Sequence, residues 1–303
     1  MNRPPILGTR ASPLALAQAQ MVAAALEAAH GWAQGTVRIH PVKTSGDRIQ
    51  DRPLAEVGGK GLWTKELDLL LLQGETDLSV HSMKDVESVR PETLVVAAML
   101  PRADVRDRLI GAATIDELSQ GAVVGTSSPR RSAQLLRLRT DLQIVPIRGN
   151  VATRLTKLAQ GEVDATFLAA AGLDRLGIEE GVPISPDVML PAPAQAAIGA
   201  ECRADDEATR GLLAAINHLP TCAAIGAERT FARAVGGSCH SPVAALAVQG
   251  GDERLWLRAE ILSTDGSDRV AGEVRFTPGD EAPQALAREL LDQAPPSIRG
   301  LFA

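Results

Sequence analysis

The 303-residue chain contains no tyrosine and only seven other aromatic residues, three tryptophans and four phenylalanines. Proteins that bind single-stranded nucleic acid stack bases on aromatic rings and carry basic surfaces. Here 31 lysines and arginines stand against 37 aspartates and glutamates, which gives a formal charge of −6. The scarcity of aromatic rings and the negative charge argue against a nucleic-acid partner, and the charge also argues against an anionic membrane surface.

Cysteine and long apolar runs are also scarce. The three cysteines, at positions 202, 222 and 239, are an odd number whose spacing fits neither a disulfide framework nor paired zinc ligands. No stretch approaches the roughly 20 apolar residues that cross a bilayer. The apolar segment 14–26 is interrupted by two glutamines, unlike a signal peptide. We therefore expect a cytoplasmic protein that binds no metal.

The first two thirds of the chain alternate short β-branched runs with segments of helical periodicity. Strands are predicted at 6–9, 36–42, 77–81, 94–98, 122–125, 143–147 and 165–168, and helices at 12–29, 61–73, 129–139, 150–160 and 170–176. Strands separated by helices predict parallel sheets with right-handed crossovers. This part of the chain is therefore expected to form two α/β domains.

The last third has a different pattern. Helices are predicted at 206–217, 222–235 and 281–293, and strands at 243–248, 255–262 and 270–276. Glycine-containing turns join these strands, which predicts a small antiparallel sheet of three strands covered by helices. The expected domains are 1–99 with 194–217, then 100–193, and finally an α+β domain at 218–303.

One short pattern occurs twice. The segments 8–13 (GTRASP) and 125–129 (GTSSP) each leave a predicted strand and enter a predicted helix, with serine as the N-cap and proline as the first helical residue. Helix capping alone explains the serine and the proline. It does not explain the cations beside both turns, so we expect two anion-binding helix N-termini at strand carboxyl ends.

Positive charge is concentrated between residues 123 and 175, where eight cations face four anions. Arg130 and Arg131 lie in the first turn of a predicted helix, where the helix dipole disfavours cations. Arg148 precedes Asn150, the expected cap of the helix that carries Arg154. Because arginine binds carboxylate or phosphate bidentately, these four are predicted to contact a ligand. A further set is expected to form only a solvated helix face: Arg137, Arg139 and Lys157.

Two other segments carry candidate chemistry. Lys84 and Asp85 follow a predicted strand, where a carboxylate could bind ligand N–H groups and stabilise a cation, although such a pair is more often a surface ion pair. Cys239 lies in a glycine-containing loop beside His240, which could favour the thiolate. Cys202 and Cys222 lie in segments that look helical and apolar and are expected to be packing residues. The glycines of 58–61 lack the P-loop pattern and are expected to form a hinge or lid.

Several motifs together resemble the porphobilinogen deaminase family, in order along nearly the whole chain. They are Thr9–Ala15 (TRASPLA), Val57–Leu62 (VGGKGL), His81–Val86 (HSMKDV), Gly125–Ser128 (GTSS) with Arg130 and Arg131, Arg148–Asn150 (RGN) and Gly236–Cys239 (GGSC).

The resemblance implies two α/β domains of the periplasmic-binding-protein type (type II) and a third domain with the cofactor cysteine. It implies a dipyrromethane joined to Cys239 by a thioether, onto which four porphobilinogen molecules condense with loss of ammonia before hydrolysis releases a linear tetrapyrrole. Asp85 and Lys84 are implied as catalytic residues. Predicted cofactor contacts are Asp85, Lys84, Thr126, Ser128, Arg130 and Arg131. Predicted substrate contacts are Arg10, Ser12, Trp63, Arg148, Arg154, Arg175 and Gln195.

The chain departs from the family pattern at four places. Glu56 occupies a position often held by lysine, and Trp63 one where phenylalanine is usual. Ala194-Gln195-Ala196 replaces a Gly-Gln-Gly pattern, and the segment 87–90 is unlike most relatives. None of these departures removes a residue that the chemistry requires.

The resemblance predicts a monomeric enzyme with a small-molecule substrate and no obligate protein partner. Two other functions stay open. A non-catalytic organic-anion-binding protein could use the same α/β domains and anion sites. Another carboxylate-handling transferase could use Asp85 and Lys84.

Overall fold

A computed structural model describes residues 3–48, 63–237 and 241–302. Its internal contacts divide the chain into two compact units, and each is discontinuous in sequence. Unit 1 comprises Met1–Ala103 and Ala196–Cys222, and unit 2 comprises Asp104–Gln195 and Ala223–Ala303.

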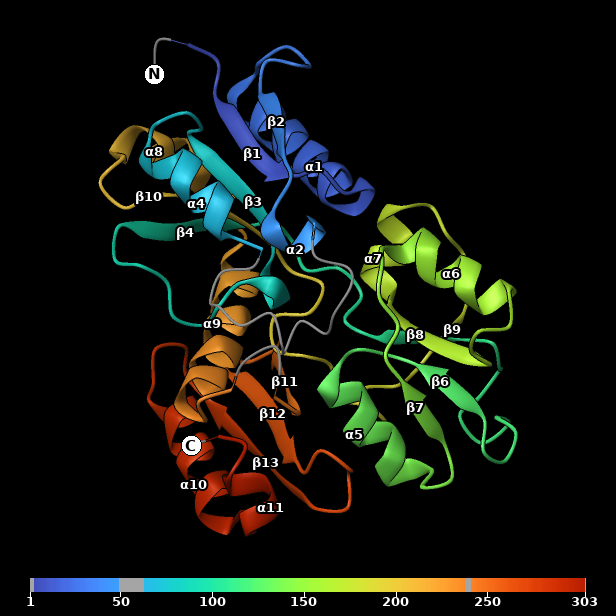
Figure 1. The fold of residues 1–303 in the computed structure, drawn as a ribbon. Helices are drawn as coiled ribbons and strands as arrows, with labels where there is room; N and C mark the ends of the chain where they lie inside the picture. The colour runs from blue at the N-terminus through green and yellow to red at the C-terminus, as the bar shows by residue number, and fades with distance from the viewer. Residues whose placement is uncertain (1–2, 49–62, 238–240, 303) are drawn as a thin grey trace. The chain divides into compact units, whose positions relative to one another are not determined.

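Unit 1 is built on a five-stranded sheet of order β2-β1-β3-β10-β4 (Figure 1). Its strands are β1 (Ile6–Arg10), β2 (Arg38–Val42), β3 (Leu78–Ser82), β4 (Leu94–Met99) and β10 (Ile198–Arg203). Strand β1 pairs in parallel with β2 and β3, whereas β10 runs antiparallel between β3 and β4. Pro41 lies in β2 at the edge of the sheet, where the missing N–H is tolerated.

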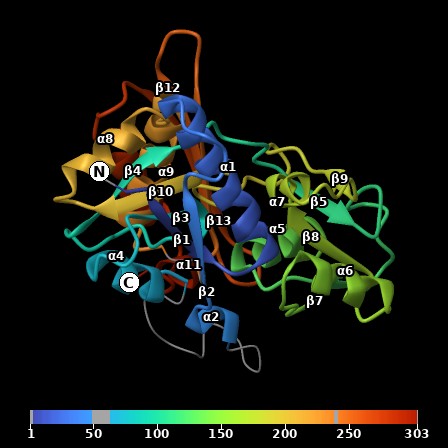
Figure 2. The same cartoon turned by 90° about the horizontal axis from the view of Figure 1, so that it is seen from above.

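Helices cover both faces of this sheet. They are α1 (Pro13–His30), α4 (Lys65–Leu72) and α8 (Glu207–Ala214), and α1 lies along β1 and β3 in Figures 1 and 2. The short helix α2 (Ser45–Arg48) follows β2. Leu7 of β1 packs in a core with Ala19, Val22 and Leu26 of α1. A Cβ on the next residue, Gly8, would instead lie 3.4 Å from the α4 residue Leu67. Because successive strand residues point to opposite faces, α1 and α4 cover opposite faces of the sheet.

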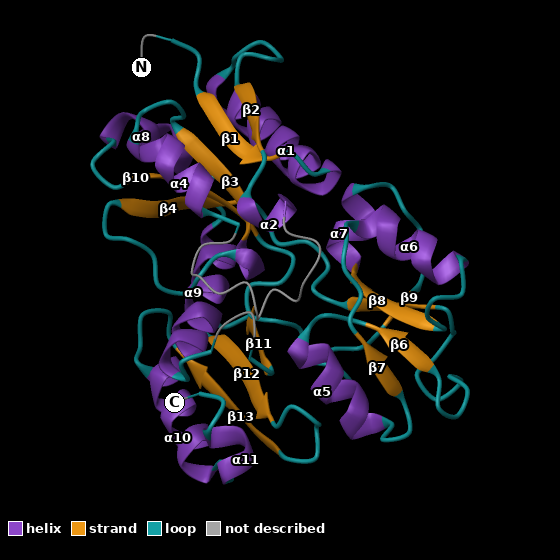
Figure 3. Cartoon of the chain, in the orientation of Figure 1, coloured by secondary structure: helices purple, strands orange, loops and turns teal. Residues whose placement is uncertain are grey.

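Unit 2 contains a second five-stranded sheet, of order β7-β6-β8-β5-β9 (Figure 3). Its strands are β5 (Asp107–Ile110), β6 (Val123–Gly125), β7 (Gln143–Val145), β8 (Ala165–Ala169) and β9 (Val182–Pro183). Helix α5 (Pro129–Leu138) contributes Leu135 to the core on one face, where Val124 and Phe167 lie. The other face packs against α6 (Val151–Ala159) and α7 (Ala170–Arg175) through Leu168 and Leu173.

The two five-stranded sheets share one spatial order of strand directions, but the antiparallel strand is the last of its sheet in sequence in unit 1 (β10) and the first in unit 2 (β5). In each sheet, three parallel strands take the spatial order second-first-third. An antiparallel strand then separates the third of them from the strand at the edge of the sheet, which is β4 in unit 1 and β9 in unit 2. The repeated serine-proline turns follow the equivalent strands β1 and β6. The sequence echo therefore marks equivalent positions in two similarly ordered sheets.

The remainder of unit 2 includes an antiparallel three-stranded sheet with helices packed on one face. The strands are β11 (Val243–Gln249), β12 (Leu255–Leu262) and β13 (Arg269–Phe276), and the helices are α9 (Leu219–Ala234), α10 (Ala282–Gln293) and α11 (Pro296–Arg299). The turn after β12 approaches α5 closely, because a Cβ on Gly266 would lie 2.1 Å from the carbonyl oxygen of Ala133. Gly266 also has a φ of +72°, so both the close approach and the backbone conformation require glycine there.

The predicted fold class, two α/β sheets followed by a three-stranded antiparallel sheet, is confirmed. The prediction that the first two sheets are parallel was wrong, because both are mixed. Three strands escaped prediction, namely β5, β9 and β10, and Cys202 lies in β10 rather than in a helix. The division into three domains stays a prediction.

Candidate functional site

In unit 1, several predicted site residues meet at one edge of the sheet. Arg10 ends β1, and Ser82 ends β3 just before the short 3₁₀ turn η1 (Met83–Asp85) that carries Lys84 and Asp85. Because β1 and β3 are parallel and in register, their carboxyl ends lie together. The hydroxyl of Ser12 accepts a hydrogen bond from the Ala15 N–H at 3.3 Å, which confirms Ser12 as the N-cap of α1.

Several of these residues line a small cleft of about 50 Å³. Its walls include four predicted site residues, Arg10, Ser12, Trp63 and Asp85. Gln18 of α1 also lines the cleft and donates a hydrogen bond of 2.8 Å to the hydroxyl of Ser82. The cleft therefore combines a cation, a helix N-terminus, an aromatic ring and a carboxylate. Lys84 is half-buried beside Asp85 but does not line it.

Trp63 is held between Arg10 and the backbone of α2. The Arg10 guanidinium carbon lies 3.9 Å from the centre of the Trp63 ring, a cation–π contact. A Cβ on Gly46 would lie 2.3 Å from the same ring, so only glycine leaves room for it. The cation–π contact orients Arg10 in the cleft. The Trp63 ring also offers an apolar face to a ligand.

The second predicted anion site, in unit 2, has the expected local structure. The Ser128 hydroxyl accepts from the N–H of Arg131 at 3.4 Å, and Pro129 is the first residue of α5. Thr126 is buried, and its hydroxyl accepts from the N–H of Ser128 at 3.2 Å. Hydrogen bonds to its own side chains, those of Thr126 and Ser128, thus hold the turn in shape.

Arg130 and Arg131 are buried and converge on a residue that the sequence analysis did not single out, Asp107. Each donates a 2.7 Å hydrogen bond to one of the two Asp107 carboxylate oxygens. The Gln195 side-chain amide donates to the same carboxylate at 3.0 Å. Burial by itself would raise the pKa of Asp107, but the two guanidinium groups outweigh it and hold the pKa far below its usual range.

This cluster, Asp107 with Arg130, Arg131 and Gln195, carries two positive charges against one negative charge. Within the described part of the chain, the Nε–H groups of Arg130 and Arg131 are buried and have no acceptor. A buried surplus cation with unused donors is costly unless an anion accompanies it. The residues present therefore fit a carboxylate-bearing group such as the one that the family resemblance implies.

The remaining predicted contacts of unit 2 are half-buried. Arg148 follows β7, and Asn150 caps α6 by accepting from the N–H of Thr153 at 2.9 Å, as predicted. The Nε–H of Arg154 donates to the Gly149 carbonyl at 3.1 Å. Arg175 ends α7, and burial lowers its pKa from the usual value.

Other predictions fall outside the described residues or need correction. Cys239, Glu56 and the glycines of 58–61 lie outside the described residues. Arg139 was expected on a solvated helix face, but it binds Asp141 bidentately and donates to the carbonyl oxygens of Ile115 and Leu118. It is a structural residue at the end of α5.

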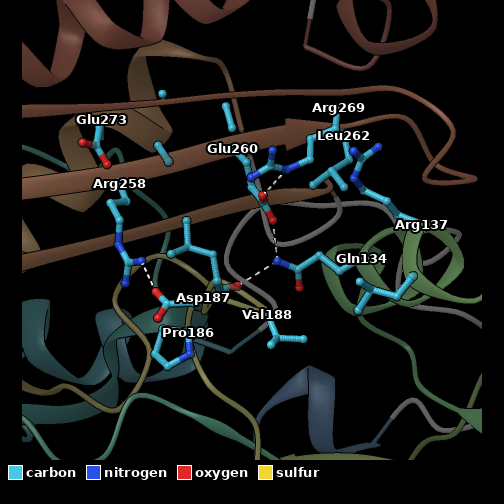
Figure 4. A pocket seen from close by; sticks show the side chains of 15 residues that line it. Gln134, Arg137, Pro186, Asp187, Val188, Arg258, Glu260, Leu262, Arg269 and Glu273 are labelled. Carbon is cyan, nitrogen blue, oxygen red and sulfur yellow. Dashed lines mark hydrogen bonds and ion pairs between the residues drawn. The ribbon is translucent and has the colours of Figure 1, made fainter. Parts of the chain in front are cut away.

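A larger hollow of about 500 Å³ lies in unit 2 between α5, the segment 186–190 and the outer face of β12 and β13. None of the predicted site residues lines it. Four of its charged side chains form two pairs, Arg258 with Asp187, and Arg269 with Glu260, which also accepts from Gln134 (Figure 4). Arg137 and Glu273 also line it, so its cations and anions are equal in number. It therefore lacks the cationic surplus of the Asp107 cluster.

Among the residues that the structure describes, no group of three or more histidine, cysteine, aspartate and glutamate side chains could hold a metal ion. In the same part of the chain, no helix has the length and apolarity needed to cross a membrane.

Comparison with known proteins gives consistent results. Residues 6–211 match the family model for the dipyrromethane cofactor binding domain of porphobilinogen deaminase, and residues 222–292 match its C-terminal domain. Relatives named porphobilinogen deaminase include one from Sphingopyxis alaskensis, 58% identical over 100% of this chain and 98% of the relative. Another, from Paracoccus denitrificans, is 52% identical over 95% of this chain and 94% of the relative.

Solved structures show weaker similarity. A TRAP periplasmic solute binding protein from Desulfovibrio salexigens superposes with a TM-score of 0.41 at 12% identity, over 72% of this chain and 73% of that one. A similarity of this size carries no argument. The two family matches and the two relatives are the basis for the assignment, and they show that the chain belongs to the porphobilinogen deaminase family.

Proposed function

We propose that this chain is a hydroxymethylbilane synthase, which condenses four porphobilinogen molecules with loss of ammonia and releases a linear tetrapyrrole by hydrolysis. The observation that supports this most directly is the cleft of unit 1, where Asp85 lies with Arg10, Ser12 and Trp63 at the carboxyl ends of parallel strands. The family match places the chain among enzymes of tetrapyrrole synthesis and disfavours a non-catalytic anion-binding protein.

Asp85 is proposed as the catalytic carboxylate. Loss of ammonia from porphobilinogen leaves a cation, and a fixed carboxylate in a partly water-excluded cleft stabilises positive charge more strongly than one in bulk water. The same carboxylate can accept hydrogen bonds from pyrrole N–H groups and take up a proton. Lys84, the adjacent cation, is proposed to bind a ligand carboxylate.

The cationic side chains are proposed to bind the acetate and propionate groups of the substrate and the product. Arginine's planar fork matches a carboxylate bidentately, and helix N-termini offer further N–H donors. The donors proposed for substrate are Arg10, Ser12, Arg148, Arg154, Arg175 and Gln195, and Trp63 is proposed to stack on a pyrrole ring.

The dipyrromethane, when bound, would supply the terminal pyrrole carbon to which the first new unit is joined. Cys239 is proposed as its attachment residue. Arg130 and Arg131 are proposed to hold its carboxylates, because the Asp107 cluster has surplus positive charge and buried N–H donors. Thr126 and Ser128 shape the turn that presents these arginines. We also propose a cytoplasmic monomer.

Intact-mass spectrometry of the purified protein tests the cofactor assignment. The holoprotein is expected to exceed its sequence mass by two linked pyrroles and to redden with an aldehyde reagent for pyrroles. Cys239→Ser is expected to abolish both signals. A protein with the bare sequence mass that binds organic anions without converting porphobilinogen would instead support the non-catalytic alternative.

Substitution of Asp85 tests the catalytic assignment. In protein whose cofactor loading is verified by mass, Asp85→Ala is expected to reduce tetrapyrrole formation by at least roughly a hundredfold, the usual cost of losing a preorganised electrostatic group. Asp205→Ala is the control, because Asp205 is exposed and lies in the same unit away from the cleft. Near-normal turnover of Asp85→Ala would refute the role.

A further inference from the structure

Arg90 lies five residues after Asp85. Its side chain is only 11% exposed. Its Nε donates to Oε1 of Glu201 at 2.9 Å, and its Nη2 donates to Oε2 of the same carboxylate at 2.8 Å. Nη2 also binds Asp68 of α4 at 2.5 Å. One guanidinium group thus connects the segment after Asp85 to a strand and a helix.

Glu201 also holds the segment that precedes Asp85. It lies in β10 with no exposed surface, and its Oε2 is 3.2 Å from Nε2 of His81 in β3. His81 is four residues before Asp85, and Arg90 is five residues after it. Both ends of the segment 81–90 therefore approach the same carboxylate, with Asp85 near its middle. Arg90 hydrogen-bonds the carboxylate, whereas the His81 ring lies beside it without a hydrogen bond.

Arg90 makes a third connection, to the residue beside Trp63. Its Nη1 donates to Glu87 at 3.1 Å and lies 3.3 Å from the hydroxyl of Thr64. The Thr64 hydroxyl also donates to Glu87, at 3.3 Å. Thr64 lines the same cleft as Asp85. The guanidinium group therefore joins a residue of the cleft wall, Thr64, to the segment that follows Asp85.

The network depends on the positive charge of Arg90, because its other charged members are carboxylates. Three carboxylates, those of Asp68, Glu87 and Glu201, converge on the single guanidinium group. Burial alone would raise the pKa of Glu201, but the nearby His81 ring and the hydrogen bonds from Arg90 lower it to about 2. Without Arg90, a buried carboxylate and two neighbouring ones would repel one another, and the segment after Asp85 would lose its anchor.

We propose that Arg90 is a positioning residue for Asp85: it clamps the Asp85 segment to β10 and α4 and thereby fixes the carboxylate in the cleft. This inference rests on the proposed function, in which Asp85 acts on the substrate. A five-donor planar fork is needed to serve Glu201 bidentately while reaching Asp68, Glu87 and Thr64, so lysine can replace only part of the arrangement.

The test compares Arg90→Gln with Arg203→Gln in the holoprotein. Arg203 lies in β10 two residues after Glu201 and also binds α4 and a carboxylate, through the Leu71 carbonyl and Asp206, but it does not contact residues 81–90. Hydrogen exchange followed by mass spectrometry should show faster exchange of residues 83–89 in Arg90→Gln only. Its kcat should fall roughly tenfold, since small misplacement of a catalytic group is costly, while KM changes less than about twofold.

Two further variants separate positioning from stability. Arg90→Lys should recover part of the lost kcat. Arg90→Gln with Glu201→Gln removes the buried negative charge, so thermal stability should recover while kcat stays low. This double variant also serves if Arg90→Gln does not fold.

Wild-type kcat in Arg90→Gln or in the double variant, or equal losses of kcat in Arg90→Gln and Arg203→Gln, would overturn the proposal. Failure of the proposed function is distinguishable, because the wild-type protein itself would then make no tetrapyrrole, whatever the exchange rates.

Discussion

Each unit contains a buried carboxylate that gathers arginine or histidine side chains. Asp107 has two guanidinium groups for one charge, whereas Glu201 and its neighbours have three carboxylates around one guanidinium group. The first excess is positive and suits an anionic ligand. The second excess is negative and serves to hold a chain segment in place, so similar residue types have opposite uses in the two units.

The lowered pKa of Glu201 predicts a pH dependence of stability. The pKa falls from 4.5 to about 2 on folding, so the stabilisation is present above pH 4.5 and is lost as the pH falls toward about 2. A shift of this size corresponds to about 3 kcal/mol. The free energy of unfolding should be measured by urea titration at pH 6 and at pH 2.5. Its decrease between these two pH values should be larger for the wild type than for Glu201→Gln, by nearly this amount.

Asp107 is present in both proteins, so its pH-dependent contribution to the free energy of unfolding cancels in the comparison. Parallel pH profiles for the two proteins would show that Glu201 has an ordinary pKa in the folded state, and would remove the electrostatic basis of the Arg90 clamp.

Single residues could be predicted from the sequence where the signal is local. Ser12, Ser128 and Asn150 cap helices as predicted, because each cap side chain and the N–H that donates to it are three residues apart. The partners of the buried arginines could not be predicted. Asp107 is 23 residues from Arg130, and Glu201 is 111 residues from Arg90, so only the folded sheet brings them together.

At the level of elements, two of the three missed strands, β5 and β10, share a cause. Strand β10 has the sequence IGAECR, and β5 has the sequence DRLI, so both are poor in β-branched residues. Each is held between two neighbours, which overrides a weak intrinsic preference. Both are also the antiparallel members of their sheets, which explains why counting alternating strands and helices predicted parallel sheets.

The crossover before β10 contains two alanines in the left-handed region, Ala194 with φ +62° and Ala196 with φ +70°. This conformation costs alanine about 1–2 kcal/mol. Gln195 between them binds Asp107, and the Ala194 N–H donates to the buried Glu228 at 2.6 Å. The hydrogen bonds on this segment hold it in a conformation that its own sequence disfavours.

Glycine scanning of this crossover should reveal the strain. Replacing a buried alanine by glycine loses a methyl contact of about 0.8 kcal/mol and adds about 0.5–1 kcal/mol of chain entropy. At Ala194, relief of strain offsets this loss, so Ala194→Gly should change the free energy of unfolding by less than about 0.5 kcal/mol. At Ala197, which is equally buried and has no positive φ, glycine should cost about 1.5 kcal/mol. Equal losses in urea unfolding at both positions would show that Ala194 carries no strain.

At the level of the whole molecule, the chain enters each unit twice. Unit 1 is completed only when 196–222 joins 1–103, because β10 lies between β3 and β4. The cleft with Arg10, Trp63 and Asp85 belongs wholly to unit 1, and so does the carboxylate that clamps its Asp85 segment. The clamp therefore depends on a strand that the chain adds about a hundred residues after Asp85.

This arrangement predicts that unit 1 can be rejoined into one continuous chain. Met99 of β4 pairs with Gly199 of β10, and the Leu100 N–H donates to the Ile198 carbonyl at 3.1 Å, so the ends of an antiparallel pair already lie opposite each other. Replacing residues 101–197 by Asn-Gly, a favoured two-residue hairpin turn, should therefore preserve the register. The resulting chain up to residue 222 has roughly 125 residues, enough for an independent core.

The rejoined chain is expected to unfold cooperatively in urea and to protect the backbone amides of β3 and β4 from hydrogen exchange. A chain that ends at residue 100 lacks β10 and is expected to do neither, because it leaves β3 and β4 without their shared partner and His81 and Arg90 without Glu201. If the rejoined chain behaved like the truncated one, completion of the sheet by β10 would be insufficient to fold unit 1. Its stability would then have to come from the rest of the chain.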